Sequence, residues 1–480
     1  MDQPDIRCRI VYGCYEGVQK TAVEMLYGMI APYVPYVLTA TPADETNLAD
    51  TGDLLILIGT CGNNAHIRSL RDAGCFEAED RREGYSIAVI ASPWHEGRRI
   101  AVLQGADDAG TLYAAADFEC YYIRHVLQYD GYHYNRRHRP FIDEALPFAR
   151  RSAPAIEHRG LWSWGHVIYD YRGYIENMSR CKLNTLILWN DFAPLNAADI
   201  VAYAHLHAVK IIWGFSWSWG EEVVPSDAAE RQKWAERVLQ TYEQQYAPLG
   251  GDGIYFQTFT ETGDTSIDGR SIAELAVDWV SGISRALYAR YPDLWVQFGL
   301  HATSIQEAYA HFSRIDPRMS IVWEDAGGFP YQYDPRNTGD IDQTLAYTQQ
   351  LLALRGAEER FGAVLKGFTV LNWKDFEHQK GPFVLGCLSR SATGRLADEK
   401  QFYWRYAAPY WINQADAMRR FATCVAEAKV RDRLVMALVE DGVWEHGIHV
   451  SAALYAALLW NPDEPIDGLL EVIMHAGYAL

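Results

Sequence analysis

Apolar and polar positions alternate along residues 1–128 in a way that predicts a small α/β domain. Short apolar runs bounded by turn residues indicate strands. The predicted strands are 9–12, 54–59, 85–91 and 99–103, and the last two form a hairpin. Residues 111–123 have the apolar spacing of a helix and follow the acidic pair Asp107-Asp108, which suits a helix N-terminus.

The segment 129–154 has no clear period and holds clustered Arg, His, Tyr and Pro, so we expect a linker. From 155 to 480, strand patterns recur with helical patterns between them. The predicted strands are 158–164, 185–189, 210–215, 253–259, 295–300, 320–324, 367–373 and 451–460, with 384–388 competing for the last place. A helical insertion is expected near 398–445. The predicted fold class is therefore α/β, a (β/α)8 TIM barrel preceded by the small domain, rather than a doubly wound sheet.

The composition narrows the class of ligand. Of the 480 residues, 49% are hydrophobic and 22% charged, which is enough for two packed cores. The net charge of −19 argues against partners such as nucleic acid or an anionic membrane surface, which attract basic proteins. Aromatic residues make up 13% of the chain, which favours a flat, partly apolar ligand.

The sequence also bears on location. The stretch Met1-Asp2-Gln3-Pro4-Asp5 lacks the basic and apolar regions of a secretory signal. The uncharged run 25–43 is interrupted by three prolines and is a poor membrane span. Eight cysteines occur without a CxxC pair, as expected for reduced thiols. We therefore expect a cytoplasmic protein.

Polar and aromatic side chains gather where the predicted barrel strands end. In TIM barrels the chemistry lies at the carboxyl ends of the strands. The residues at or near these ends are Trp162, Trp164, His166, Asn190, Asp191, Trp217, Trp219, Glu261, His301, Glu324, Asp325, Trp373, Asp375, Trp460 and Asn461. Singly, a tryptophan there usually packs at the rim and an acid usually caps a helix. Their recurrence on successive strands favours a binding site.

Paired carboxylates with aromatic rings suit the cleavage of a glycoside. One carboxylic acid protonates the leaving oxygen, and the other activates water or attacks the anomeric carbon. The acid needs a poorly solvated position, and we expect Glu261 to meet this need because it follows the apolar run 254–256. We expect four tryptophans to line the sugar site: Trp164, Trp217, Trp373 and Trp460. Two further residues, Asn190 and Asp191, are expected to bind sugar hydroxyls.

An acidic sugar would also need a cation in the site. The nearby candidates are Arg159, Lys374, His166 and His301. Arginine is best suited to a bidentate grip on a carboxylate. Arg159 is equally suited to a structural pair with a carboxylate inside the protein.

Several stretches carry a family resemblance that covers nearly the whole chain. Residues 84–87, 99–102 and 105–114 resemble the α/β domain that precedes the barrel in β-N-acetylhexosaminidases and α-glucuronidases. Residues 158–161 and 181–186 resemble the first two barrel strands of the same group. The resemblance implies a glycoside hydrolase.

Two segments bear on the activity within this group. Hexosaminidases that use the substrate's acetamido group carry adjacent acids after strand four, where this chain has Thr260-Glu261-Thr262. Residues 253–261 and 374–376 instead resemble α-glucuronidases, which implies Glu261 as the acid and Asp375 as a base. Glu324 or Asp325 would then position the water. Residues 459–462 resemble the last strand of some hexosaminidases, so the sugar stays open.

Other classes have less support. The chain has no HExxH, Walker A or GxGxxG motif at a strand–helix junction, and we expect no metal and no cofactor. The predicted function is an exo-acting glycosidase that cleaves a terminal sugar from short oligosaccharides. The alternative is an inactive carbohydrate-binding barrel, which Thr260 favours. The tryptophan-rich segments 162–164 and 213–219 could also serve as a contact in a homo-oligomer.

Overall fold

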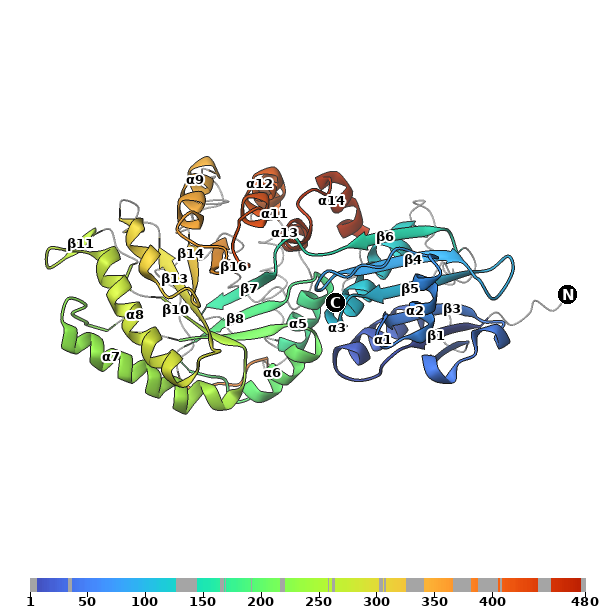
Figure 1. The fold of residues 1–480 in the computed structure, drawn as a ribbon, viewed down its shortest axis with the longest axis horizontal. Helices are drawn as coiled ribbons and strands as arrows, with labels where there is room; N and C mark the ends of the chain where they lie inside the picture. The colour runs from blue at the N-terminus through green and yellow to red at the C-terminus, as the bar shows by residue number, and fades with distance from the viewer. Residues whose placement is uncertain are drawn as a thin grey trace.

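In the computed structural model, an N-terminal α/β domain and a closed barrel lie side by side along the long axis of the molecule (Figure 1). The structure describes residues 7–32, 37–126, 145–164, 168, 170–190, 192–215, 221–257, 259–260, 264–301, 305, 308–324, 341–365, 381–386, 405, 408–438 and 450–475.

The N-terminal domain is a six-stranded sheet with helices on both faces. The strands follow the spatial order β2 (Leu38–Pro42), β1 (Cys8–Tyr12), β3 (Leu54–Thr60), β5 (Arg99–Gly105), β4 (Tyr85–Ala91) and β6 (Phe148–Ser152). The helices are α1 (Gly17–Ile30), α2 (Ala65–Asp72) and α3 (Asp108–Asp117), which continues as the π-helical segment η3 (Phe118–Val126). Two short 3-10 turns, η1 (Ala43–Glu45) and η2 (Leu48–Asp50), follow β2. Alternate residues of the central strands pack on α1 and α3 or on α2.

The sequence predicted several of these elements. The hairpin of β4 and β5 is confirmed, with Tyr85 opposite Gly105 and Ala91 opposite Arg99. The predicted cap is also confirmed, because Asp107 Oδ1 accepts a hydrogen bond from Gly110 N at 2.8 Å. The predicted linker 129–154 needs correction at its end. Residues 148–152 form β6, which pairs antiparallel with β4 and so belongs to the sheet.

The second part is a closed parallel barrel of eight strands, as predicted. In chain order the strands are β7 (His158–Trp164), β8 (Thr185–Trp189), β9 (Lys210–Gly214), β10 (Gly253–Gln257), β13 (Trp295–His301), β14 (Ser320–Glu324), β15 (Arg360–Leu365) and β16 (Asp432–Leu438). The small hairpin of β11 (Ser266–Ile267) and β12 (Arg270–Ser271) lies outside the barrel sheet. The first six strands confirm the predicted positions.

Helices surround the barrel (Figure 1). They are α5 (Tyr171–Arg180), α6 (Ala197–Leu206), α7 (Ala228–Thr241), α8 (Ile272–Arg290), α9 (Ile341–Leu352), α11 (Ala408–Asn413), α12 (Ala415–Ala426), α13 (Val450–Trp460) and α14 (Ile466–His475). Short turns η4 (Tyr242–Tyr246), η5 (Ala247–Leu249) and η6 (Tyr309–Arg314) add to them. The outer faces of the strands pack against these helices in one continuous core.

The last two strands differ from the prediction. β15 precedes the predicted strand 367–373, which lies outside the described residues. β16 lies within the segment predicted as a helical insertion, 398–445. Residues 451–460 form helix α13, because this alanine- and leucine-rich stretch favours a helix that is buried on all sides. Residues 384–386 of the competing segment form no strand.

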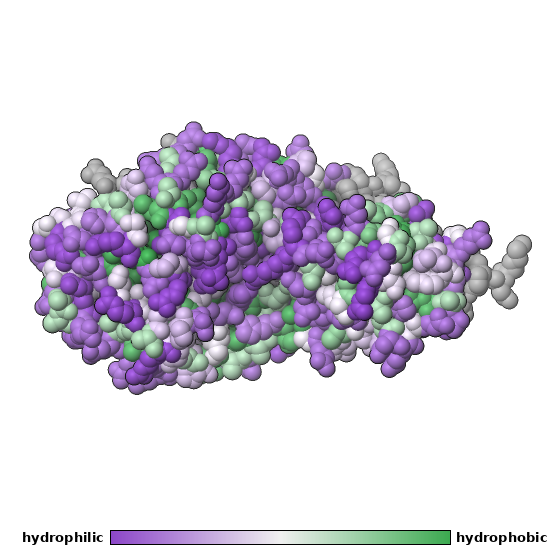
Figure 2. Space-filling view, viewed as in Figure 1, coloured by the Kyte–Doolittle hydropathy of each residue, from purple (hydrophilic) through white to green (hydrophobic). Residues whose placement is uncertain are grey.

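The surface is mainly hydrophilic on the face shown in Figure 2, in keeping with the net charge of −19. Among the described residues, no helix combines the length and apolar character that a membrane span requires. The described cysteines form no disulfide with one another.

Candidate active site at the carboxyl end of the barrel

Three neighbouring strands end in polar side chains that face the barrel interior. Gln257 ends β10, His301 ends β13 and Glu324 ends β14, and the register places His301 beside Glu324. All three side chains are buried, and Glu324 has no exposed surface. Because inward-facing residues alternate along each strand, these side chains form the layer nearest the carboxyl end of the barrel.

Both carboxylate oxygens of Glu324 have polar side chains as neighbours. Tyr255 Oη donates a hydrogen bond to Glu324 Oε1 at 2.5 Å, and Gln257 Nε2 donates to the same oxygen. Oε2 lies 3.2 Å from His301 Nε2, which is also 2.9 Å from Gln257 Nε2. At this distance, Oε2 and Nε2 are close enough for a proton to pass between a carboxyl and an imidazole. Glu324 and His301 thus form a pair suited to acid–base chemistry.

Gly299 makes room for this cluster. A Cβ atom at this position would overlap Tyr255 Oη and would lie 2.8 Å from Gln257 Cγ. Either contact would displace the donors of Glu324, so the strand must carry a glycine where the tyrosine hydroxyl crosses it.

Aromatic rings from neighbouring strands lie within the same end of the barrel interior. Trp162 of β7 stacks on Trp189 of β8 with ring centroids 5.7 Å apart and planes inclined by 12°. Both rings lie near Tyr255, at 5.1 and 5.8 Å between centroids. The two indoles are nearly fully buried. They therefore pack around the tyrosine ring whose hydroxyl contacts Glu324.

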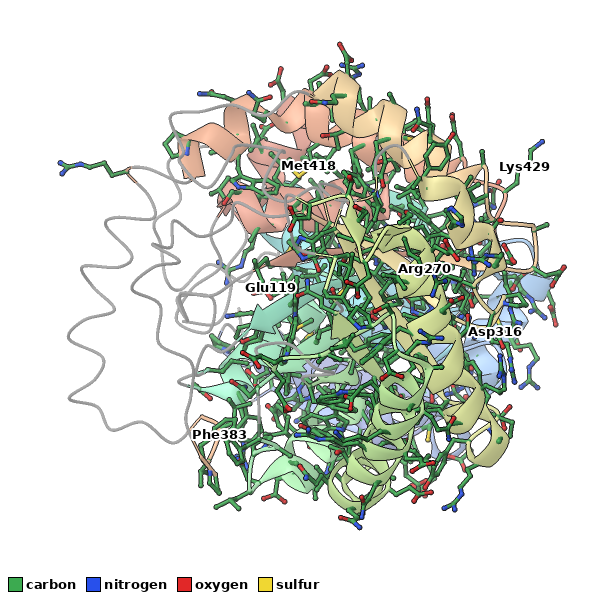
Figure 3. All side chains as sticks on the ribbon, turned by 90° about the vertical axis from the view of Figure 1, so that its left-hand side faces the viewer. Glu119, Arg270, Asp316, Phe383, Met418 and Lys429 are labelled. Carbon is green, nitrogen blue, oxygen red and sulfur yellow. The ribbon has the colours of Figure 1, made fainter. Side chains whose placement is uncertain are left out.

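Asn190 follows β8 and lines a small cavity of about 10 Å³, close to the volume that one water needs. Phe383 and Gly214 lie in the same lining. In Figure 3, Phe383 lies on the opposite side of the barrel from Asp316, which precedes β14, so the cavity is at the carboxyl end. Within the described part of the chain, Oδ1 of Asn190 is buried and has no hydrogen-bond partner. This acceptor suits a ligand hydroxyl.

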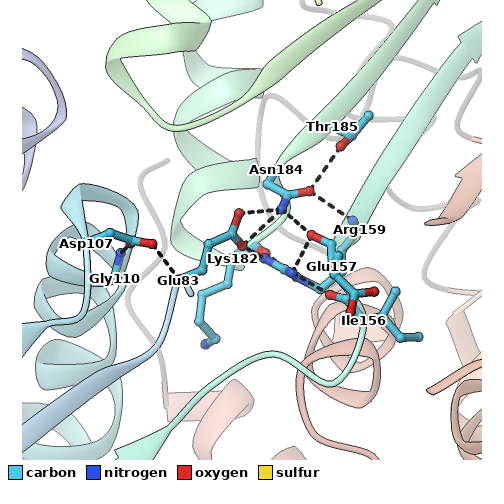
Figure 4. A network of polar contacts seen from close by, with 9 residues as sticks. All are labelled: Glu83, Asp107, Gly110, Ile156, Glu157, Arg159, Lys182, Asn184 and Thr185. Carbon is cyan, nitrogen blue, oxygen red and sulfur yellow. Dashed lines mark hydrogen bonds and ion pairs between the residues drawn. The ribbon is translucent and has the colours of Figure 1, made fainter. Parts of the chain in front are cut away.

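Arg159 lies at the opposite end of the barrel. It is the second residue of β7, and its fully buried guanidinium contacts Glu83 of the N-terminal domain, with 2.6 Å between Nη2 and Oε2 (Figure 4). Asn184 donates to both oxygens of Glu83 at 3.0 Å. Arg159 also donates to the carbonyls of Ile156 and Lys182, at 2.6 and 2.9 Å. This placement corrects the prediction of a substrate-binding role and matches the structural alternative.

Trp460 also lies in the contact between the two domains. It ends helix α13, its ring stacks on Tyr85 at 5.9 Å, and its Nε1 donates to Ser152 Oγ at 2.7 Å. Beside it, Lys182 Nζ lies 2.7 Å from Asp117 Oδ1. The expectation that Trp460 lines a sugar site is corrected, because it rested on a strand that is a helix.

Several predicted site residues lie outside the described part of the chain. They are Glu261, Asp375, Asp325, His166, Asp191, Trp217 and Trp373. Trp164 belongs to β7, but its side chain is outside the described part as well. Of the predicted residues that are described, the structure brings Glu324 and His301 together and places Asn190 at the same end of the barrel. Among described residues there is no cluster of three side chains that could hold a metal ion.

Three residues of the site, Tyr255, Gln257 and Gly299, were not predicted from the sequence. They lie inside strands or at a strand end that carries no charge, whereas the prediction relied mainly on charged and indole residues after the strands. The available signal was the period of two along β10, which turns both Tyr255 and Gln257 toward the barrel interior.

Comparisons with known proteins bear on the fold. No family model matches the chain, and no curated protein sequence matches it. A GH138 enzyme targeting pectin rhamnogalacturonan II is similar in structure, with a TM-score of 0.50 and 12% identity. That similarity covers 95% of this chain and 51% of the other, so this chain spans about half of that protein's length.

CpGH84B is similar with a TM-score of 0.56 and 10% identity, over 96% of this chain and 69% of the other. At this level of identity, the similarities establish a shared fold. The prediction of a (β/α)8 barrel with a preceding α/β domain is confirmed.

Proposed function

We propose that this protein is an exo-acting glycoside hydrolase that removes a terminal sugar from short oligosaccharides by carboxylate acid–base catalysis. The observation that carries the proposal is the buried Glu324, held by Tyr255, Gln257 and His301 at the carboxyl end of the barrel. The fold shared with the GH138 enzyme, which is named as targeting a pectin, supports a carbohydrate substrate.

The contacts of Glu324 suit an anionic role. Two neutral donors on Oε1 stabilise negative charge, and an oxocarbenium-like transition state carries positive charge beside it. Glu324 would therefore act as the base or the nucleophile, with His301 beside it to take up a proton. Glu261, after the buried strand β10, would be the general acid. Asp325 and Asp375 are the further carboxylates of the proposed site.

For the substrate, we propose a class of sugar. The resemblance supports an α-glucuronide or an N-acetyl-β-hexosaminide, with Asn190 and Asp191 on hydroxyls and Trp164, Trp217 and Trp373 against the ring. With Arg159 placed elsewhere, Lys374, His166 and His301 remain as the candidates to contact an acidic sugar. Unpaired cysteines such as Cys8 and Cys181 support a cytoplasmic location for the reaction.

A panel of aryl glycosides tests the proposal. The substrates are an N-acetyl-β-glucosaminide, an N-acetyl-β-galactosaminide, an α-glucuronide and simple hexosides, each offered to the wild type and to Glu324→Gln and Glu261→Gln. We expect turnover of one class that both variants lose. Turnover that survives in Glu324→Gln would contradict the role given to this residue.

The alternative is a carbohydrate-binding barrel without chemistry. Thr260 favours it, since it stands where hexosaminidases carry an acid and is buried, with its Oγ1 3.4 Å from the backbone nitrogen of His301. Such a protein would bind oligosaccharides with equal affinity in the wild type and in Glu261→Gln, and it would turn over no substrate of the panel.

A further inference from the structure

A groove lined by tyrosines lies on the N-terminal domain. It has a volume of about 460 Å³ and runs between the end of β1, the outer face of α1 and the edge strand β2. Its lining includes Tyr12, Tyr15, Glu24, Tyr27 and Gly28. None of these residues takes part in the candidate active site or in the contacts of Glu83 and Arg159.

Two of the tyrosine rings are exposed although they are large and partly apolar. Tyr15 is 45% exposed and Tyr27 is 37% exposed. Tyr12 packs against Tyr15 with centroids 5.5 Å apart and planes inclined by 42°. The exposed rings thus present apolar faces to the groove.

The ring of Tyr15 is held in place from more than one side. Its hydroxyl donates to Glu24 Oε1 at 2.8 Å, and Lys20 Nζ lies 5.6 Å from the ring centroid. Lys20 in turn lies 3.8 Å from Glu24. A ring fixed in this way loses little freedom when a ligand stacks on it, which favours binding.

Gly28 keeps the groove open beside Tyr27. It lies in the last turns of α1, and apart from its chain neighbours and the helix's own backbone, no atom lies within 4 Å of the place where a Cβ would stand. Neither close packing nor a left-handed backbone therefore requires glycine, although glycine disfavours a helix by about 1 kcal/mol relative to alanine. The open space is the feature that a larger residue would remove.

We propose that this groove binds a neutral glycan chain as a second carbohydrate site, apart from the active site. Tyrosine rings stack on the apolar C–H faces of pyranoses, and the carboxylate of Glu24 and the tyrosine hydroxyls bind sugar hydroxyls. The acid that lines the groove disfavours uronic acids there. The choice of a carbohydrate rests on the proposed function, and the site would hold a longer glycan while the barrel removes its terminal sugar.

Affinity electrophoresis of the full-length protein in gels that contain a neutral β-glucan, a β-mannan or a galactan tests this site, with polygalacturonate as the anionic comparison. We expect retardation by at least one neutral glycan and none by polygalacturonate. Tyr15→Ala, Tyr27→Ala and the groove-filling Gly28→Leu should each weaken binding by about tenfold, in line with the loss of one stacking contact. Leucine also favours a helix more than glycine does, so a loss of glycan binding in Gly28→Leu would not be caused by unfolding of α1.

Two controls separate this site from the active site. Val224→Ala removes an apolar side chain that is 52% exposed elsewhere and should bind as the wild type does. Glu324→Gln should keep glycan retardation while losing aryl-glycoside turnover, and the groove variants should do the reverse. Retardation that is absent in the wild type, or unchanged in all three groove variants, would overturn the proposal. Self-association that the groove variants abolish, without glycan binding, would assign the groove to a second copy of the chain instead.

Discussion

The two ends of the barrel strands each bury a carboxylate, but they provide it with different partners. At the amino end, Glu83 meets the guanidinium of Arg159, which stays charged at any working pH. At the carboxyl end, Glu324 meets two neutral donors and the imidazole of His301, a side chain that carries no fixed charge. A permanent charge pair fixes two domains together, whereas a carboxyl beside an imidazole is a pair of groups suited to proton transfer.

The titration behaviour of the amino end supports this contrast. Burial would raise the pKa of Glu83, but Arg159, with Lys210 and Arg82, outweighs it and lowers that pKa below its usual value. Burial and the positive charge of Lys210 hold the pKa of His158 well below its usual value, so this imidazole stays neutral. Glu83 therefore stays ionised and His158 stays neutral at neutral pH.

The largest expected effect is on catalysis at the carboxyl end. Glu324→Gln keeps the shape of the side chain and removes its charge, so kcat/KM should fall by about 10²- to 10⁴-fold, the range for a lost acid–base group. Steady-state kinetics on the aryl glycoside that the wild type cleaves measures the loss. A midpoint of thermal unfolding within a few degrees of the wild type would show that the fold is intact.

The next effect is on stability at the amino end. Arg159→Met leaves Glu83 buried without its cation and should lower the free energy of unfolding by about 3–5 kcal/mol. Urea denaturation measures it, and the folded protein should keep its kcat. The double variant Glu83→Gln/Arg159→Met removes both charges and should recover much of the loss. If it were as unstable as the single variant, the ion pair would not be the cause.

A smaller effect is expected from the donors of Glu324. Tyr255→Phe removes one hydrogen bond to a charged oxygen, worth about 1.5–3 kcal/mol, so kcat should fall by about 10- to 100-fold. Gly299→Ala should lower kcat as well, because the new methyl group displaces the tyrosine hydroxyl. Kinetics that stay at the wild-type level in both variants would show that this contact does not position Glu324.

The smallest expected effect is the response to acid. Because the pKa of Glu83 is lower in the folded protein than its usual 4.5, its contribution to stability is present above that value and is lost as the pH falls through the folded pKa. Thermal midpoints of the wild type should therefore decline more steeply below pH 4.5 than those of Glu83→Gln/Arg159→Met. If the thermal midpoints of the two proteins declined in parallel, the lowered pKa assigned to Glu83 would be contradicted.

Much of the fold follows from the sequence, because buried parallel strands leave short apolar runs between helical segments. That pattern located six barrel strands and the hairpin of β4 and β5. It failed at residues 432–438 and 451–460, where the apolar runs 434–438 and 452–460 carry no period that separates strand from helix. Only the closure of the barrel, in which β16 pairs with both β15 and β7, decides between them.

The candidate site was predictable where a charged residue ends a strand, as for Glu324 and His301. Arg159 was misplaced because its type suited a substrate carboxylate, while its position near the start of β7 points to the other end of the barrel. Trp460 was assigned to the site because residues 451–460 were predicted to form a barrel strand, whereas they form helix α13. Tyr255 contacts Glu324 across Gly299, a long-range contact that no local pattern in the sequence reveals.

The most direct test of the contrast between the two ends is to measure turnover and unfolding together for Glu324→Gln and Arg159→Met. We predict that Glu324→Gln loses turnover and keeps its stability, while Arg159→Met loses stability and keeps the turnover of its folded fraction. If Arg159→Met stayed stable but lost turnover, or Glu324→Gln remained active, the chemistry would not lie at the carboxyl end of the barrel.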